Sequence, residues 1–265
     1  MKHVRQPAVA GTFYPRDTAE LAADARRYLE QAAPACGKDG VAPKALIVPH
    51  AGYVYSAPVA AAAYVRLAAV RDIIKRVILL GPAHYLPIQG LAASSVSSFA
   101  TPLGEVPVDR RAIESLRDLP QVAVRDDAHG PEHCLEVQLP FLQIILNDFA
   151  IVPLLVGAAT YGEVRDVIDR LWDGPETLFV ISSDLSHYYP YETARRLDAE
   201  TAAAIVALEA DAIGDEQACG RAPIGGLLLA ARGHGLHAVV ADLRNSGDTA
   251  GSRSEVVGYG SFLFT

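Results

Sequence analysis

Histidine side chains follow three apolar segments of this chain, and this grouping is the first sign of a chemical site. The three residues are His50, His84 and His187, and Asp184 stands just before the last of them. A fourth histidine, His133, lies between two glutamates in the stretch 132–136. Imidazoles that converge beside carboxylates suit a divalent transition metal, with histidine serving as ligand or as acid and base.

His50 and His84 are the best candidates for metal ligands, because each follows an apolar segment by one to four residues. The alternative is that they only cap strand ends or neighbouring helices. Asp184 and His187 are three residues apart, so the carboxylate could orient the imidazole for acid–base chemistry. Asp184 could equally be the N-cap of a short helix.

His133 and Cys219 are each open to two interpretations. His133 and Glu136 are three residues apart, so Glu136 could orient the imidazole or could merely complete a helix start. Cys219 is followed by Gly220 and Arg221, and a nearby arginine favours the thiolate form. Cys219 is therefore a candidate metal ligand or reactive thiol, with an inert, half-buried cysteine as the alternative.

The three cysteines, Cys36, Cys134 and Cys219, do not form the even-numbered framework of a disulfide-rich secreted protein. The N-terminal residues lack the apolar core of a signal peptide, and no run of about eighteen uncharged apolar residues follows. These features predict a reducing, cytoplasmic setting. They also predict that the protein has no membrane partner.

The net charge and the length of the chain bear on its binding partners and on its number of domains. Lys and Arg number 23 against 31 Asp and Glu, a formal net charge of −8 that disfavours nucleic-acid binding. Hydrophobic residues make up 51% of the chain, which is enough for a large core. With no repeat or linker to divide it, the chain is expected to form one domain over residues 1–265.

Apolar segments alternate with helical patterns along the chain. Strands are expected at 45–49, 77–81, 91–95, 150–156, 177–182, 236–243 and 256–264, and helices at about 58–69, 134–146, 162–172, 192–208 and 224–232. Pro153 places the strand 150–156 at a sheet edge or a bulge. The helix 134–146 is expected to begin near His133 and to be interrupted at Pro140.

The order of these elements predicts an α/β fold with a mixed, largely parallel central sheet covered by helices on both faces. In such sheets, sites gather beyond the carboxyl ends of the strands. The four histidines are therefore expected to converge on one rim. The chain has no P-loop, dinucleotide-binding glycine motif, Gly-x-Ser-x-Gly elbow, His-Glu-x-x-His helix or Cys-x-x-Cys pair, which disfavours NTPases, Rossmann dehydrogenases, α/β-hydrolases and zinc ribbons.

Six segments, in this order, resemble the Memo family (mediator of ErbB-driven cell motility), whose microbial members are known as AmmeMemoRadiSam system protein B. They are Arg-Gln-Pro-Ala-Val-Ala-Gly-Thr-Phe-Tyr-Pro at 5–15, Pro-His-Ala-Gly-Tyr at 49–53, Gly-Pro-Ala-His at 81–84, Glu-His-Cys-Leu-Glu at 132–136, Ser-Ser-Asp-Leu-Ser-His at 182–187 and Cys-Gly-Arg-Ala-Pro-Ile-Gly at 219–225. The segments span nearly the whole chain.

The resemblance implies a fold like that of the class III extradiol dioxygenases, in which two His and one Glu hold non-haem Fe(II). In the Memo family a Cys replaces the carboxylate, so the implied ligands here are His50, His84 and Cys219. The resemblance also places His133, Asp184 and His187 around the pocket, with His187 matching the acid–base histidine of the dioxygenases. This chain departs from the family pattern at Cys134, where the family usually has Ser, so the choice of sulfur ligand stays open.

A thiolate ligand makes copper or zinc competitive with Fe(II), and a dioxygenase fold does not by itself imply dioxygenase activity. One hypothesis is a metal-dependent redox protein that uses Fe(II) or Cu on O₂ or a small aromatic or peptide-borne substrate, with His187 and His133 as acid and base. A second is an adaptor whose cleft, rimmed by Arg221 and Tyr53, holds an anionic phosphopeptide. A third, taken from the family name, is an accessory role beside a radical SAM enzyme in a modification system.

Overall fold

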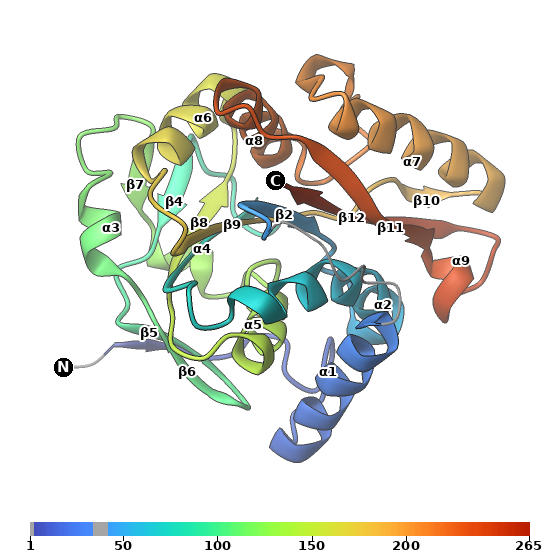
Figure 1. The fold of residues 1–265 in the computed structure, drawn as a ribbon, viewed down its shortest axis with the longest axis horizontal. Helices are drawn as coiled ribbons and strands as arrows, with labels where there is room; N and C mark the ends of the chain where they lie inside the picture. The colour runs from blue at the N-terminus through green and yellow to red at the C-terminus, as the bar shows by residue number, and fades with distance from the viewer. Residues whose placement is uncertain (1–2, 34–41) are drawn as a thin grey trace.

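The computed structural model describes residues 3–33 and 42–265, so Cys36 lies outside the described residues. Across the described part of the chain, nine strands form one sheet in the order β10-β12-β2-β9-β3-β8-β4-β7, with β11 paired to the other edge of β12 (Figure 1). A smaller sheet has the order β1-β5-β6, and its strands are Val4–Arg5, Ser98–Thr101 and Gly104–Pro107.

Four neighbouring strands run parallel and form the centre of the large sheet. They are β2 (Ala45–Val48), β9 (Thr177–Ser182), β3 (Arg76–Pro82) and β8 (Ala150–Val156). Their residues are almost all buried, as expected of strands covered on both faces. The predicted mixed, largely parallel sheet is confirmed.

The remaining strands extend this centre on both sides. On one side, β12 (Val256–Phe264) runs antiparallel to β2 and also pairs with β11 (Ala238–Asn245) and β10 (His187–Tyr189). On the other side, β4 (Leu91–Ala93) runs antiparallel to β8, and β7 (Val122–Val124) runs parallel to β4. The sheet is therefore mixed at its edges and parallel where the predicted histidine loops leave it.

Helices cover both faces of the sheet, and alternate strand residues point to each layer. Leu46 and Val48 pack with α1 (Thr18–Ala32), α2 (Tyr53–Tyr64) and α5 (Leu139–Ile145). Ala45 and Ile47 pack on the opposite side with α6 (Tyr161–Arg170), α7 (Tyr191–Val206) and α8 (Arg221–Gly233). Figure 1 shows these two groups on either side of the sheet. The shorter helices are η2 (Val65–Val70), α3 (Arg110–Glu114), α4 (Asp126–His129), η3 (Glu136–Gln138), η4 (Ala210–Ala212) and α9 (Ser246–Thr249).

Strand β8 is an inner strand, so the expectation that Pro153 marks an edge or a bulge is wrong. Pro153 lies in register with Leu79 of β3, whereas the pairing with β4 covers only Leu154–Val156. The carbonyl of Ile151 points away from β3, where it accepts from the Asp109 amide. Because residues two apart face the same edge of a strand, the nitrogen of Pro153 also points away from β3. The nitrogen of Pro153 therefore faces a position that β4 does not reach, so the missing N–H removes no hydrogen bond between β8 and β4.

Helix α2 begins five residues before the expected start at Pro58. The carbonyl of Gly52 accepts from the amides of Tyr55 and Ser56 at 2.9 and 3.1 Å, which starts the helix directly after the His50 loop. Together with η2, it gives a helical segment, Tyr53–Val70, that is long and apolar enough to cross a membrane by length and composition alone. More than half of this segment is buried inside the protein, as is typical of a core helix.

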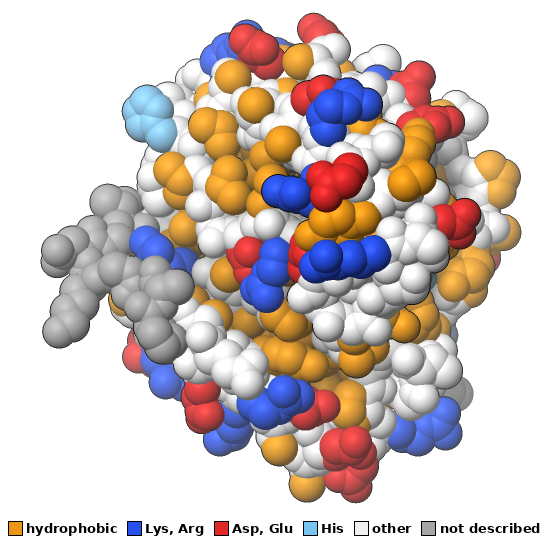
Figure 2. Space-filling view, turned by 90° about the vertical axis from the view of Figure 1, so that its right-hand side faces the viewer, with side chains coloured by type: hydrophobic (Ala, Val, Ile, Leu, Met, Phe, Trp, Pro, Cys, Tyr) orange, Lys and Arg blue, Asp and Glu red, His pale blue; other side chains and the backbone are white. Residues whose placement is uncertain are grey.

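The surface formed around α7, β11 and α9 carries interspersed charges. Figure 2 shows Lys and Arg side chains next to Asp and Glu side chains on this side of the molecule. Four ion pairs account for part of this pattern: Arg195–Glu192, Arg196–Glu200, Arg244–Asp242 and Arg253–Asp248. Basic residues on this face are therefore accompanied by acidic ones, in keeping with the acidic composition.

Candidate metal centre and its pocket

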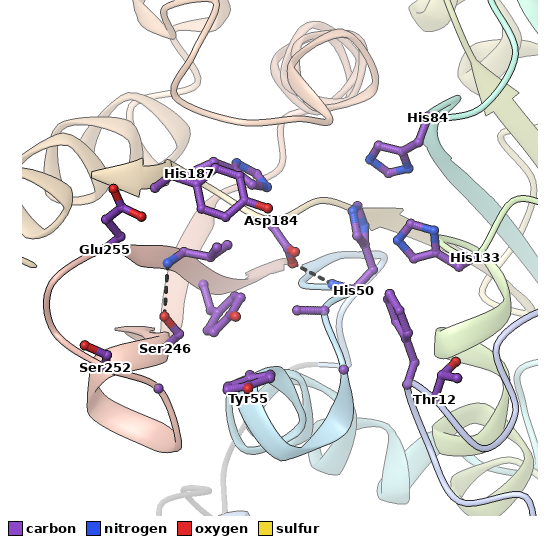
Figure 3. A pocket seen from close by; sticks show the side chains of 17 residues that line it. Thr12, His50, Tyr55, His84, His133, Asp184, His187, Ser246, Ser252 and Glu255 are labelled. Carbon is purple, nitrogen blue, oxygen red and sulfur yellow. Dashed lines mark hydrogen bonds between the residues drawn. The ribbon is translucent and has the colours of Figure 1, made fainter. Parts of the chain in front are cut away.

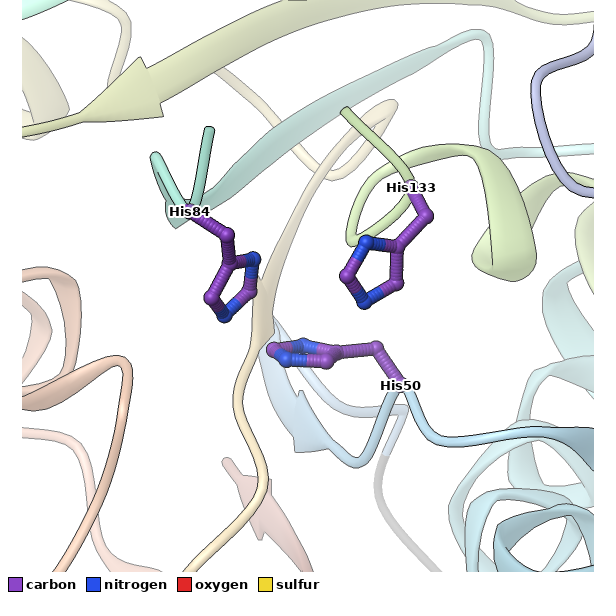
Figure 4. A group of neighbouring side chains, drawn as sticks. All are labelled: His50, His84 and His133. Carbon is purple, nitrogen blue, oxygen red and sulfur yellow. The ribbon is translucent and has the colours of Figure 1, made fainter. Parts of the chain in front are cut away.

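Three histidines meet beyond the carboxyl ends of the parallel strands. His50 follows β2, His84 follows β3, and His133 comes from the loop before η3. Their ring centroids are 5.0–5.6 Å apart, and one ring nitrogen from each lies within 4.8 Å of the others. The rings point toward one another (Figure 4). We call these residues the histidine cluster.

The tautomer of His84 is fixed by a buried carboxylate. Glu132 Oε1 lies 2.9 Å from His84 Nδ1, and Glu132 Oε2 accepts from the His84 amide at 2.6 Å. Burial acts to raise the pKa of Glu132, but its hydrogen bonds with His84 outweigh this and bring the pKa to about 2. An ionised carboxylate can only accept, so Nδ1 carries the proton and the lone pair of Nε2 is left for a ligand.

The tautomer of His50 also follows from the hydrogen bonds around its ring. Ser182 Oγ donates its only proton to the Cys134 carbonyl at 2.7 Å and lies 3.0 Å from His50 Nδ1. Nδ1 must therefore be the donor in that contact, which leaves the Nε2 lone pair as an acceptor, 3.4 Å from Cys219 Sγ. Burial, reinforced by His84 and His133, holds the pKa of His50 well below its usual range. A neutral imidazole is the form that binds a metal.

His133 lies in a loop, not in the helix that was expected to begin beside it. The helical stretch starts only with η3 and continues as α5 from Leu139. The ring of Phe13 packs against His133 with centroids 4.7 Å apart, and burial lowers the pKa of His133. Its Nδ1 is buried without a hydrogen-bond partner, 3.3 Å from Glu132 Oε1. An orphaned, neutral imidazole nitrogen suits a site made for a ligand that the protein itself does not supply.

Glu132 is the site residue that the sequence interpretation missed. In addition to His84, it accepts from the amides of His133 and Cys134 at 2.9 and 3.1 Å, so one carboxylate holds two loops together. The signal available in the sequence was its place directly before His133. Of the two roles considered for Glu136, the structure supports the helix start, because Glu136 is the first residue of η3. Its carboxylate accepts from Arg5, Tyr14 and the amide of Ala8, so it does not orient His133.

Cys219 lies beside His50, at the edge of the histidine cluster. Its Sγ is 3.4 Å from His50 Nε2 and 3.6 Å from the Asp184 carbonyl oxygen. A Cβ on the next residue, Gly220, would come within 2.6 Å of the Ser183 side chain, so glycine is needed for this close approach. Burial, together with the charge of Asp184, raises the pKa of the Cys219 thiol to about 12.

Cys134 packs beside the histidine cluster and is not the metal ligand that we favour. Its sulfur, the Glu132 carboxylate and His84 form a second group with metal-binding atoms within 4.8 Å of one another. However, Cys134 is fully buried, its Sγ donates to the Pro82 carbonyl at 3.1 Å, and burial raises the pKa of its thiol. The Glu132 oxygens are also already used by four donors. We therefore favour the histidine cluster, which faces a cavity, as the metal-binding group.

A pocket of about 680 Å³ opens next to the histidine cluster, and Asp184 and His187 also line it (Figure 3). Asp184, considered either as the group that orients His187 or as a helix N-cap, precedes no helix, and its Oδ1 accepts from the His50 amide at 2.7 Å. Burial raises the pKa of Asp184. His187 also borders a second cavity of about 300 Å³, together with Cys219. The structure thus brings all six predicted site residues into one region, with Cys219 on the side away from the main pocket.

Two residues proposed for the rim of an anion-binding cleft do not line this pocket. Tyr53 is buried, and its hydroxyl donates to the Val137 carbonyl at 2.9 Å. Arg221 forms an ion pair with Asp215. Among the described residues that line the pocket there is no Lys or Arg. Neither Tyr53 nor Arg221 therefore contributes to the rim of this pocket.

Comparison with known proteins gives a consistent family assignment. The family described as Memo-like protein matches residues 5–263. A MEMO1 family protein of Aquifex aeolicus is 36% identical over 275 residues, covering 98% of this chain and 99% of the relative. A MEMO1 family protein of Aeropyrum pernix is 38% identical over 285 residues, covering 97% and 98%. A crystal structure of an uncharacterized protein from Escherichia coli K12 has a TM-score of 0.52 at 15% identity, covering 81% of this chain and 98% of that chain, and supports the fold alone.

Proposed function

This chain belongs to the family of Memo-like proteins, and we propose that it is a metal-dependent redox protein that binds one ion through His50 and His84. Cys219 and His133 are the further donors in this proposal, because Cys219 Sγ lies 3.4 Å from His50 Nε2 and the centroid of the His133 ring lies within 5.6 Å of those of both imidazoles. A set of imidazoles with one sulfur suits iron, copper or zinc, and we favour Fe(II) or copper. When bound, such an ion would supply one-electron chemistry and Lewis acidity to a small molecule in the pocket.

The side chains around the cluster have distinct tasks in this proposal. Glu132 keeps the proton on His84 Nδ1, so that Nε2 presents its lone pair. Asp184 holds the backbone of His50 in place through the 2.7 Å bond to its amide. His187 lines the pocket without belonging to the cluster, so it is placed to accept or donate a proton at a ligand.

One observation carries the proposal: His50 and His84 are both held with Nδ1 as donor, so both Nε2 atoms present a lone pair, and that of His50 lies 3.4 Å from Cys219 Sγ. The test is metal analysis by mass spectrometry on protein purified without a histidine tag. We expect about one equivalent of iron or copper per chain. His50→Ala and His84→Ala should lose it, while the exposed His237→Ala serves as the matched control.

Three further variants separate the roles of the remaining residues. Loss of metal in Cys219→Ala but not in His133→Ala would support the two-His-one-Cys set, and the reverse would support three imidazoles. His187→Ala should retain the metal, because His187 lies outside the cluster. Failure of the wild-type protein to take up a stoichiometric ion after anaerobic reconstitution would refute the metal-dependent function.

A further inference from the structure

The main pocket has two chemically different ends. In Figure 3 the histidine cluster lies at one end, and Ser246, Ser252 and Glu255 lie at the other. We call the second the serine–glutamate end. The pocket volume of about 680 Å³ leaves room for an organic molecule that spans both ends. The proposed metal would account only for the histidine end, so the opposite end needs its own explanation.

The charge at the serine–glutamate end is negative and is not neutralised by the described part of the chain. Glu255 is exposed, and its side chain takes part in no ion pair or hydrogen bond with a described residue. The other carboxylate of the pocket, Asp184, is buried and already accepts from the His50 amide. Because the described lining contains no Lys or Arg, an anionic group at this end would meet repulsion, whereas a cation would find an unpaired partner.

Aromatic rings line the same pocket and point to the same kind of ligand. Tyr55, Tyr188 and Tyr259 all border it, and an ammonium group is attracted to the faces of such rings. Tyr188 is 72% exposed and has a φ of 60°, a left-handed conformation that costs free energy for a tyrosine. The hydroxyl of Tyr259 makes no hydrogen bond to a described residue, although the side chain is almost fully buried. A strained backbone and an unpaired hydroxyl are expected where side chains are positioned to bind a ligand.

We propose that the serine–glutamate end is a binding site for the ammonium group of an elongated arylalkylamine, with Glu255 as the counter-ion and the tyrosine rings as its wall. The other end of the ligand then reaches the histidine cluster, and only that part rests on the proposed function. Glu255 is thereby a specificity-determining residue that favours amines over carboxylic acids of the same shape.

The test compares three probes that share one ring and differ in the charge of the side chain: tyramine, 4-hydroxyphenylacetate and 4-ethylphenol. Their dissociation constants are measured by isothermal titration calorimetry on metal-free and on metal-loaded protein. We expect tyramine to bind about tenfold more tightly than 4-hydroxyphenylacetate, with 4-ethylphenol between them. This order should hold in both forms, because Glu255 lies at the end away from the metal.

Glu255→Gln should abolish most of the preference for tyramine, whereas Glu30→Gln, an exposed glutamate on α1 outside the pocket, should keep it. Tyr55→Leu should weaken tyramine more than 4-ethylphenol. The proposal is overturned if the acid binds as tightly as the amine, if Glu255→Gln leaves the ratio unchanged, or if tyramine shows no binding at millimolar concentration. The ratio of the two dissociation constants is also measured on metal-free protein. A protein that binds no metal would therefore refute the proposed function, but the amine preference would still be tested.

Discussion

The carboxylate of Glu132 binds His84 twice, through the backbone amide at 2.6 Å and through Nδ1 at 2.9 Å. The same carboxylate also accepts from the amides of His133 and Cys134. One buried charge therefore sets the position of His84, its tautomer and the loop that carries His133. Such carboxylate–histidine pairs tune metal sites by raising the basicity of the ligand.

Glu132→Gln should weaken metal binding without removing any proposed ligand. The neutral amide cannot hold the Nδ1 proton of His84 as strongly, so we expect an affinity loss of about 10- to 100-fold. Competition with a chromogenic chelator measures this, with Glu30→Gln as the control. Equal affinities for wild type and Glu132→Gln would show that the carboxylate does not tune the site.

Arg5→Met should destabilise the protein strongly. Arg5 forms a buried ion pair with Glu136, which also accepts from Tyr14 and the amides of Ala8 and Val9. Loss of the guanidinium leaves a buried charge without its counter-ion, at an expected cost of about 3–5 kcal/mol in the free energy of unfolding. Urea denaturation measures the change.

The exposed pair of Arg27 and Asp24 supplies the control for Arg5→Met. Arg27→Met should leave the urea midpoint almost unchanged, because solvent screens that pair. Similar midpoints for the two variants would contradict the role we give to the buried pair, which is to hold the N-terminal segment against the start of η3.

His129 should make stability depend on pH. Burial lowers the pKa of His129 from 6.5 to about 4, and its Nε2 donates to the Ala92 carbonyl at 2.9 Å. Because the folded pKa lies below the unfolded one, the stabilisation is complete above about pH 6.5 and is lost as the pH falls toward 4. Between pH 7.5 and pH 5 this residue alone should remove about 2 kcal/mol.

The measurement for His129 is the free energy of unfolding of wild type and His129→Gln at both pH values. Gln keeps a donor for the Ala92 carbonyl but does not titrate, so the difference between the two proteins should shrink at the lower pH. A constant difference across this range would mean that His129 titrates normally in the folded protein.

Gly81→Ala should disturb the site by crowding. A Cβ at Gly81 would lie 2.7 Å from Cys134 Sγ and 3.0 Å from Leu135, so the loop that carries Glu132 and His133 would have to move. We expect a loss of about 1–3 kcal/mol in stability together with weaker metal binding. Gly233→Ala, where a Cβ would meet nothing within 4 Å, is the control. Unchanged stability and metal content in Gly81→Ala would show that the loop adapts freely.

Much of the fold could be predicted from the sequence because its signals are local. The buried strands β2, β3 and β9 appear as short apolar runs, and the carboxyl ends of parallel strands share one edge of the sheet. These two facts were enough to place His50 and His84 on a common rim. The six motif segments were likewise enough to indicate the Memo family, which the comparisons confirm.

What the sequence could not decide depends on contacts between distant segments. That Glu132 rather than Glu136 supports the histidines, that His133 joins the cluster from a loop, and that Pro153 sits in an inner strand follow from packing. Spacing along the chain limits which side chains are able to meet, but the partner of a buried charge is selected by which donors the tertiary structure brings within reach. The sequence by itself therefore determined the family, the sheet and its histidine-bearing rim, and only the tertiary structure decided which charge serves which imidazole.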